Sequence, residues 1–176
     1  GNPEVPFIEV DINFSLGNVP GERETLLAEM LATRKKYEGK APMYVADEEM
    51  FFLQLVLHQY KESCLYFTVE RGKDLDLYKL ADMYYLWKGE LFDKSRLKRL
   101  VCKYGAQKET GAALGQTGRI FSDGEILSAA EEYGDRPPEV TDYDLKKKYR
   151  WTADERMRLG RFDAKSFLRE IKDNDE

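Results

Sequence analysis

The chain has 176 residues, of which 42% are hydrophobic and 35% are charged, and this balance is typical of a globular domain with a sizeable core. The composition excludes an intrinsically disordered chain, and no apolar run reaches the roughly 20 residues that a membrane-spanning helix needs. The formal net charge is −5, with 28 basic and 33 acidic residues, which disfavours non-specific binding to nucleic acid.

Residues 1–21 are predicted to form an extended arm. Apolar and polar side chains alternate over residues 7–14, which is the pattern of a strand with one apolar face. The apolar members are Ile8, Val10, Ile12 and Phe14. No second strand of similar quality follows, so we expect this strand to pack on the domain or to add to a sheet edge of a protein partner.

Residues 22–136 are predicted to form one helical-repeat domain. The spacing of apolar residues predicts a first helix over 22–37 and a second over 46–60, which is apolar nearly all round and therefore buried on several sides. Further helices are expected over 63–70, 74–88, 93–104 and 122–133. Residues 106–117 are expected to form a shorter helix or turn, because they contain glycine.

The helix expected over 74–88 has an apolar face in the helical pattern. Its predicted members are Leu77, Leu80, Ala81, Tyr84 and Tyr85. The outward faces of this helix and of its counterpart in the next repeat are expected to contact partners.

One sequence pattern occurs twice, starting at Gly89 and again 29 residues later at Gly118. Repeats of this length indicate stacked helical hairpins, in which each unit is a helix, a Gly turn, a second helix and a closing Gly. The matching positions are Gly89, Phe92, Leu97, Tyr104 and Gly105 in the first copy, and Gly118, Phe121, Ile126, Tyr133 and Gly134 in the second. We expect the Phe at the hairpin crossing, the Leu or Ile on the inner face, the Tyr over the next hairpin, and the last Gly as a left-handed cap.

Residues 78–105, YKLADMYYLWKGELFDKSRLKRLVCKYG, resemble a pentatricopeptide repeat in their early Tyr, their Gly at the turn and their closing Gly. The resemblance implies an all-α array of two or three stacked helical hairpins. Members of that family mostly work in organelles and usually read single-stranded RNA. This chain is acidic and lacks a clear column of base-reading Asn, Ser or Thr, so protein binding is the favoured function and RNA binding an alternative.

A pentatricopeptide-like extra subunit is also known on the mitochondrial F1-ATPase of euglenozoan protists. This chain is similar to it in size, repeat number and acidic helical character. The similarity implies a structural subunit of the F1 sector of ATP synthase and a mitochondrial location.

A second resemblance supports a rival function. Residues 104–122 resemble the helix-turn-helix of phage Cro-type repressors, with the turn at Leu114-Gly115. Gln116 and Arg119 would then read bases, although Gly118 would cost the recognition helix about 1 kcal/mol. A DNA-binding regulator therefore remains an alternative.

Catalytic and cofactor motifs are weak throughout the chain. The single His, His58, lies in an apolar helical pattern and is expected to be a core residue. No phosphate loop is recognisable, and we expect no enzyme activity, no cofactor and no metal. Cys64 and Cys102 also lie in apolar patterns and are expected in the core, in a reducing intracellular compartment if the location is not mitochondrial.

Residues 137–176 are predicted to form a tail that wraps the domain or a partner. Pro137-Pro138 ends the repeats, and two short helices are expected over 153–159 and 164–171. Trp151 and Phe162 are the expected anchors on other protein subunits. Together these features predict a non-catalytic subunit or adaptor of a larger protein assembly.

Overall fold

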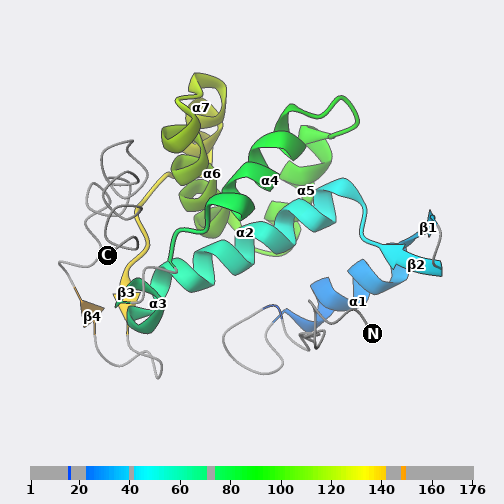
Figure 1. Ribbon diagram of the computed structural model, residues 1–176, viewed down its shortest axis with the longest axis horizontal. Coiled ribbons are helices and arrows are strands. Elements are labelled where there is room, and N and C mark those ends of the chain that lie inside the picture. The colour runs from blue at the N-terminus through cyan, green and yellow to red at the C-terminus, as the bar shows by residue number, and fades with distance from the viewer. Residues whose placement is uncertain (1–15, 17–22, 40–41, 71–73, 142–147, 150–176) are drawn as a thin grey trace, which may run out of the picture.

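A computed structural model describes residues 16, 23–39, 42–70, 74–141 and 148–149 of the chain (Figure 1). These residues are mostly helical, as predicted, with seven helices and four short strands. The helices are α1 Glu24–Thr33, α2 Glu48–Cys64, α3 Tyr66–Glu70, α4 Leu77–Lys88, α5 Lys94–Lys103, α6 Gln107–Phe121 and α7 Gly124–Glu132. The strands are β1 Lys35–Glu38, β2 Pro42–Val45, β3 Val140–Thr141 and β4 Lys148–Tyr149.

Several predictions fall outside the described residues. They concern the strand over 7–14 and the tail helices over 153–159 and 164–171. The residues expected to bind partners there are Ile8, Val10, Ile12, Phe14, Trp151 and Phe162.

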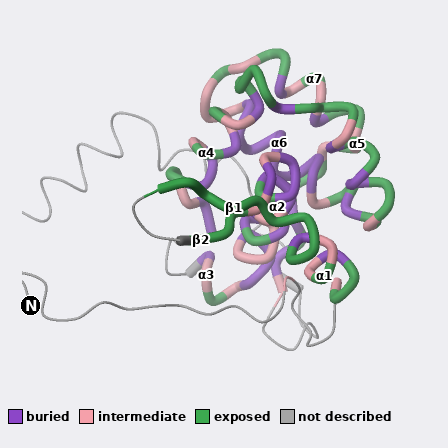
Figure 2. The backbone as a smooth tube through the Cα atoms, turned by 90° about the vertical axis from the view of Figure 1, so that its right-hand side faces the viewer, coloured by how far each residue is buried: buried purple, intermediate pink, exposed green. Residues whose placement is uncertain are grey.

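Helix α2 lies at the centre of the fold, where α4, α5 and α6 all pack against it (Figure 1). It is buried on several sides, as its nearly continuous apolar sequence predicts, and Figure 2 shows buried positions concentrated around it. Asp47 caps the helix by accepting a hydrogen bond from the Met50 backbone N–H at 3.0 Å. The aromatic ring of Phe52 then contacts the rings of Trp87 and Phe92, with centroids 5.9 and 5.1 Å apart.

The first helix is shorter than predicted. Helix α1 ends at Thr33, and the expected last turn is instead strand β1, which pairs antiparallel with β2. Leu26 and Met30 are buried, but Thr33 and Arg34 follow on that face and offer no apolar side chain to continue it. The two-stranded hairpin, which the sequence analysis did not predict, projects from the end of the molecule (Figure 1).

The helix predicted over 63–70 is interrupted at Leu65. This residue has an extended backbone, with φ −93° and ψ 125°, and forms a β-bridge with Thr141. Helix α2 therefore runs on to Cys64, four residues past its predicted end, and α3 is a single short turn. Val140 beside the bridge is buried, so the start of the predicted tail packs on the core.

The segment over 106–117, predicted as a shorter helix or a turn, is helical and belongs to the long, buried helix α6. The three glycines of α6, Gly111, Gly115 and Gly118, lie where atoms of α7 or of the residues after it come close. A Cβ atom on Gly111 would lie 3.1 Å from the Tyr133 carbonyl oxygen, and one on Gly118 would lie 2.8 Å from Cγ of Leu127. Glycine here lets α7 and the residues after it approach α6 closely, which offsets its low helix propensity.

The second helices of the two sequence repeats end alike. Leu97 on α5 and Ile126 on α7 are fully buried at matching positions. Gly105 and Gly134 follow these helices with φ of 62° and 79°, which confirms the predicted left-handed caps.

The first halves of the repeats differ. Gly89 ends α4, whereas Gly118 lies inside α6 and is no turn residue. Phe92 follows a helix and Phe121 ends one, so the two occupy different places. The helix expected to begin at residue 122 begins at Gly124, because Ser122 is the left-handed end of α6 and Asp123 caps α7.

The packing of the two helix pairs differs as well. Helices α6 and α7 form a closely packed hairpin, whereas α4 and α5 have little close backbone contact and each lies against α2. Tyr104, expected over the next hairpin, donates a hydrogen bond back to Glu29 on α1. Phe121 stacks on Tyr84 of α4, with ring centroids 4.5 Å apart.

Candidate docking groove between α2 and α4

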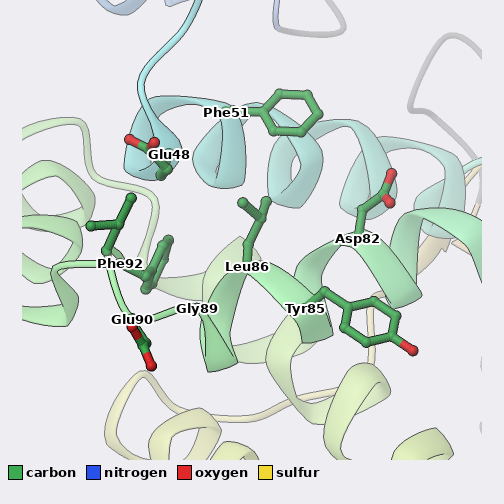
Figure 3. Close-up of a pocket in the computed structure, with 9 residues that line it drawn as sticks. Glu48, Phe51, Asp82, Tyr85, Leu86, Gly89, Glu90 and Phe92 are labelled. Carbon is green, nitrogen blue, oxygen red and sulfur yellow. The ribbon is translucent and has the colours of Figure 1, made fainter.

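A surface groove lies where the first half of α2 runs beside the end of α4 (Figure 3). Its volume is about 470 Å³, and the connection from α4 to α5 completes its wall. Apolar side chains form most of the lining, and we call this feature the α2–α4 groove. Its apolar members are Phe51, Tyr85, Leu86, Leu91 and Phe92.

Three of these apolar side chains are exposed to solvent. Leu91 is 84% exposed, Tyr85 is 71% exposed and Phe51 is 39% exposed. Below them, Phe92 is buried and joins the groove to the aromatic contacts of the core. The groove is therefore the outer end of the main hydrophobic core, and it leaves large apolar side chains exposed to solvent.

The α4–α5 connection shapes the groove by turning sharply at Gly89. The Gly89 N–H donates to the Leu86 carbonyl at 3.0 Å, and the Phe92 N–H donates to the Gly89 carbonyl at 3.2 Å. These bonds end α4 and fold the chain back within a few residues. Phe92 then enters the core, and Leu91 is left on the outside.

The register of α4 decides which of its side chains reach the groove. Its buried apolar face consists of Leu80, Met83 and Trp87, whereas Leu77 and Tyr85, predicted to share that face, are exposed. Figure 3 shows that the side chains of Asp82 and Leu86 on α4 are directed toward α2 and that the side chain of Tyr85 is directed away from it. The predicted apolar face of this helix is therefore confirmed at Leu80 and in part at Tyr84, which packs against the core, and is wrong at Leu77 and Tyr85.

Three carboxylates surround the apolar lining, and they come from three different segments. Glu48 is on α2, Asp82 is on α4, and Glu90 is in the connection after α4. The backbone N–H of Glu48 itself lowers the pKa of its carboxylate, and Lys35, with its Nζ 3.1 Å away, lowers that pKa further. Among the described residues, Asp82 and Glu90 have no cation within ion-pair distance. The groove is therefore apolar inside and negative at its edge.

The lysines nearest to Glu90 in the sequence, Lys88 and Lys94, pair with carboxylates outside the groove. Lys88 lies 2.8 Å from a carboxylate oxygen of both Asp123 and Glu125 on the α7 side. Lys94 also pairs with Glu125 and lies over the Trp87 ring. These pairs hold α4, α5 and α7 together and leave Asp82 and Glu90 uncompensated.

Two of the repeat-defining residues, Gly89 and Phe92, meet in the groove. The other repeat-defining residues lie in the core or at helix ends and form no common surface site. Sequence reasoning missed the three acidic residues and the exposed Leu91. The available signal was the run Gly89–Phe92, in which an apolar residue stands inside a turn where no helical face can bury it.

The residues proposed to read DNA, Gln116 and Arg119, form hydrogen bonds within the fold. Gln116 is buried, and its amide accepts from Gln59 and donates to Ser63 at 3.3 Å in each case. Arg119 donates to Asp135 at 2.7 Å. The turn expected at Leu114-Gly115 is absent, because α6 runs through it without a break.

The residues considered as catalytic or metal-binding candidates do not form a common site. His58 is half-exposed rather than buried, with its Nε2 3.2 Å from a Glu62 oxygen. Cys64 is in the core as expected, but Cys102 is exposed. Over the described ranges, His, Cys, Asp and Glu side chains nowhere gather in groups of three that could hold a metal ion.

No helix in the described part of the chain combines the length and the apolar character needed to cross a bilayer. No protein-family model, curated protein sequence or solved structure gave a significant match to this chain.

Proposed function

We propose that this chain is a non-catalytic subunit or adaptor of a larger protein assembly and that it docks through the α2–α4 groove. The proposal rests on the exposure of Leu91, Tyr85 and Phe51 around the groove, whose volume is about 470 Å³. Contiguous apolar surface of this kind marks interaction sites, and aromatic residues are enriched where proteins meet. Each Å² of apolar surface that a partner covers would contribute about 25 cal/mol to binding before the costs of association.

Helical-repeat architecture is the second part of the proposal. We infer that α4–α5 and α6–α7 are two units of a pentatricopeptide-like array. The support is the shared end of the second helix in each pair, with a buried Leu97 or Ile126 and a left-handed Gly105 or Gly134. Arrays of this kind present extended surfaces to partners, which agrees with a docking role.

The most specific form of the proposal names the assembly. The sequence resemblance to a pentatricopeptide-like subunit makes the mitochondrial F1-ATPase the first complex to test. Purified F1 depleted of small subunits should bind the chain and carry it through gel filtration at a fixed ratio. If the chain elutes apart from F1, this assignment is wrong and the docking proposal must be tested on other assemblies.

The general test is co-purification from native extract with a matched pair of variants. Leu91→Ser removes the most exposed apolar side chain of the groove and should abolish stoichiometric recovery with the assembly. Leu31→Ser, at a 55% exposed position on α1 outside the groove, is the control and should leave recovery unchanged. Both variants should unfold within about 0.5 kcal/mol of the unmodified chain, because neither side chain belongs to the core. Recovery of the unmodified chain solely as a monomer would contradict the proposal.

A further inference from the structure

We propose that the occupant of the α2–α4 groove is a partner segment that carries a large apolar side chain flanked by Lys or Arg. This inference rests on the proposed docking function and adds the chemistry of the partner. It follows from two properties of the groove, its apolar lining and the sign of the charges around it.

The lining of the groove requires the partner's inserted side chain to be apolar. Leu86, directed toward α2, and the buried Phe92 form the inner surface, and Leu91 stands exposed beside them. A polar side chain placed there would lose its hydrogen bonds to water without gaining protein partners, because few polar atoms line the inner surface. A Leu, Met or Phe side chain would gain from the same burial.

The charge requirement comes from Asp82 and Glu90, which lack a cation partner among the described residues. Glu48 adds a third carboxylate, although Lys35 pairs with it. A segment with Lys or Arg beside its apolar anchor would supply the missing partners, and the exposed ring of Tyr85 offers a face for a guanidinium or ammonium group. An acidic segment would meet like charges on each side of the groove.

The basic residues of the neighbouring helices do not neutralise the groove. On α4, Lys88 is turned to Asp123 and Glu125 and does not neutralise the groove. On α5, Arg96 is paired with the buried Asp47 and Glu49. The local excess of negative charge therefore survives the ion pairs that surround it, and it agrees in sign with the net charge of −5.

The test uses fluorescently labelled peptides of defined chemistry and the full chain. One peptide carries leucines at helical spacing flanked by lysines, a second has glutamates in place of the lysines, and a third has serines in place of the leucines. At low salt we expect the basic leucine peptide to bind at least about tenfold more tightly than either of the others, as read by fluorescence anisotropy. Its affinity should fall as salt rises.

The decisive variant is Asp82→Asn with Glu90→Gln, which removes both unpaired carboxylates and keeps their size. It should lose most of the preference for the basic peptide over the acidic one. The control is Glu38→Gln with Glu131→Gln, which changes the net charge equally at exposed positions outside the groove and should bind like the unmodified chain. Equal binding of basic and acidic peptides, an unchanged preference in the double variant, or no binding of the basic peptide would each overturn the inference.

Failure of this inference can be separated from failure of the proposed function. If Leu91→Ser abolishes recovery of the assembly and the Asp82→Asn, Glu90→Gln variant does not, the groove docks a partner whose flanks are not basic. If sedimentation shows a dimer of the chain that Leu91→Ser disrupts, the occupant is a second copy and the inference is wrong. If Leu91→Ser leaves the assembly intact, the proposed docking function fails as well.

Discussion

Arg96 on α5 holds Asp47, the residue that caps the central helix α2, with a guanidinium nitrogen 2.5 Å from the carboxylate. A second guanidinium nitrogen lies 2.5 Å from Glu49, and Glu49 also accepts the backbone N–H of Asp93 at 2.7 Å. Asp47 and Glu49 are each only 3% exposed. One arginine therefore joins the beginnings of α2 and α5, which lie far apart in the sequence, and compensates two buried carboxylates.

The first prediction is that Arg96→Met strongly destabilises the fold. The change leaves Asp47 and Glu49 buried without their cation, and losing one partner of a buried ion pair typically costs about 3–5 kcal/mol. Since Arg96 is itself one-third exposed, we expect about 2–4 kcal/mol in urea unfolding. Lys98→Met, on the same helix but in an exposed pair with Glu132, should change stability by less than about 0.5 kcal/mol. Similar effects of the two variants would show that Arg96 is not a structural link.

The second prediction concerns the close approach of α6 and α7. Gly118→Ala should lower the free energy of unfolding by about 1–2 kcal/mol, because the new methyl group would lie 2.8 Å from Cγ of Leu127 and 3.0 Å from its backbone nitrogen. This overpacking exceeds the gain of about 1 kcal/mol that alanine brings to a helix interior.

Gly124→Ala is the matched control for that prediction. Gly124 is the first residue of α7, and no heavy atom lies within 4 Å of the place where its Cβ would stand. We expect this variant to be neutral or slightly more stable in the same denaturant titration. If Gly118→Ala also proved stabilising, the two helices would not be in the close contact described.

The helical character of the chain could be predicted from sequence because apolar residues recur at helical spacing in almost every segment. The nearly continuous apolar run from Met50 to Leu57 likewise identified the central helix. Helix α6 was predicted only as a shorter helix or turn because glycine is a turn signal, and the fit of its glycines depends on Leu127 and Tyr133, which approach only in the folded state. Strands β1 and β2 were missed because the exposed side chains of residues 35–38 and 43–45 carry no alternation toward a core.

The groove could be predicted only in part. Gly89 and Phe92 were singled out from the repeat, and both line it. The positions of Asp82 and Tyr85 depend on the rotation of α4 about its axis, which is fixed by Trp87 packing against Phe52 of a distant segment. A helical pattern that contains apolar residues on more than one face does not determine that rotation.

The third prediction tests the left-handed caps that the two repeats share. Gly105→Ala and Gly134→Ala should each destabilise the fold by about 1–2 kcal/mol, because an L-residue is strained at φ of 62° or 79°. Steric overlap does not cause this loss of stability, since no heavy atom lies within 4 Å of either added Cβ. The corresponding Asn variants should lose less, because Asn tolerates this conformation better. Equal losses for Ala and Asn in thermal unfolding would point to another cause.

The last prediction concerns the acid stability of the cluster that joins α4, α5 and α7. Lys88 and then Lys94, with a smaller contribution from the indole N–H of Trp87, lower the pKa of Glu125 from 4.5 to about 2. A carboxylate whose pKa is lower in the folded chain stabilises the fold fully above its unfolded pKa. That contribution is therefore present above about pH 5 and is lost as the pH falls toward 2.

Glu125→Gln should accordingly weaken the fold at neutral pH and flatten the loss of stability between about pH 5 and pH 2. Because half of the Glu125 side chain is exposed, water screens its ion pairs, and we expect less than about 1 kcal/mol at neutral pH. The measurement is urea unfolding of both chains across this pH range. Glu131→Gln, on the same helix and without a cation partner among the described residues, should leave the pH dependence unchanged. An acid transition that is the same with and without Glu125 would show that its ion pairs do not contribute to folding, and the close packing of α6 on α7 would then have to hold α7 in place by itself.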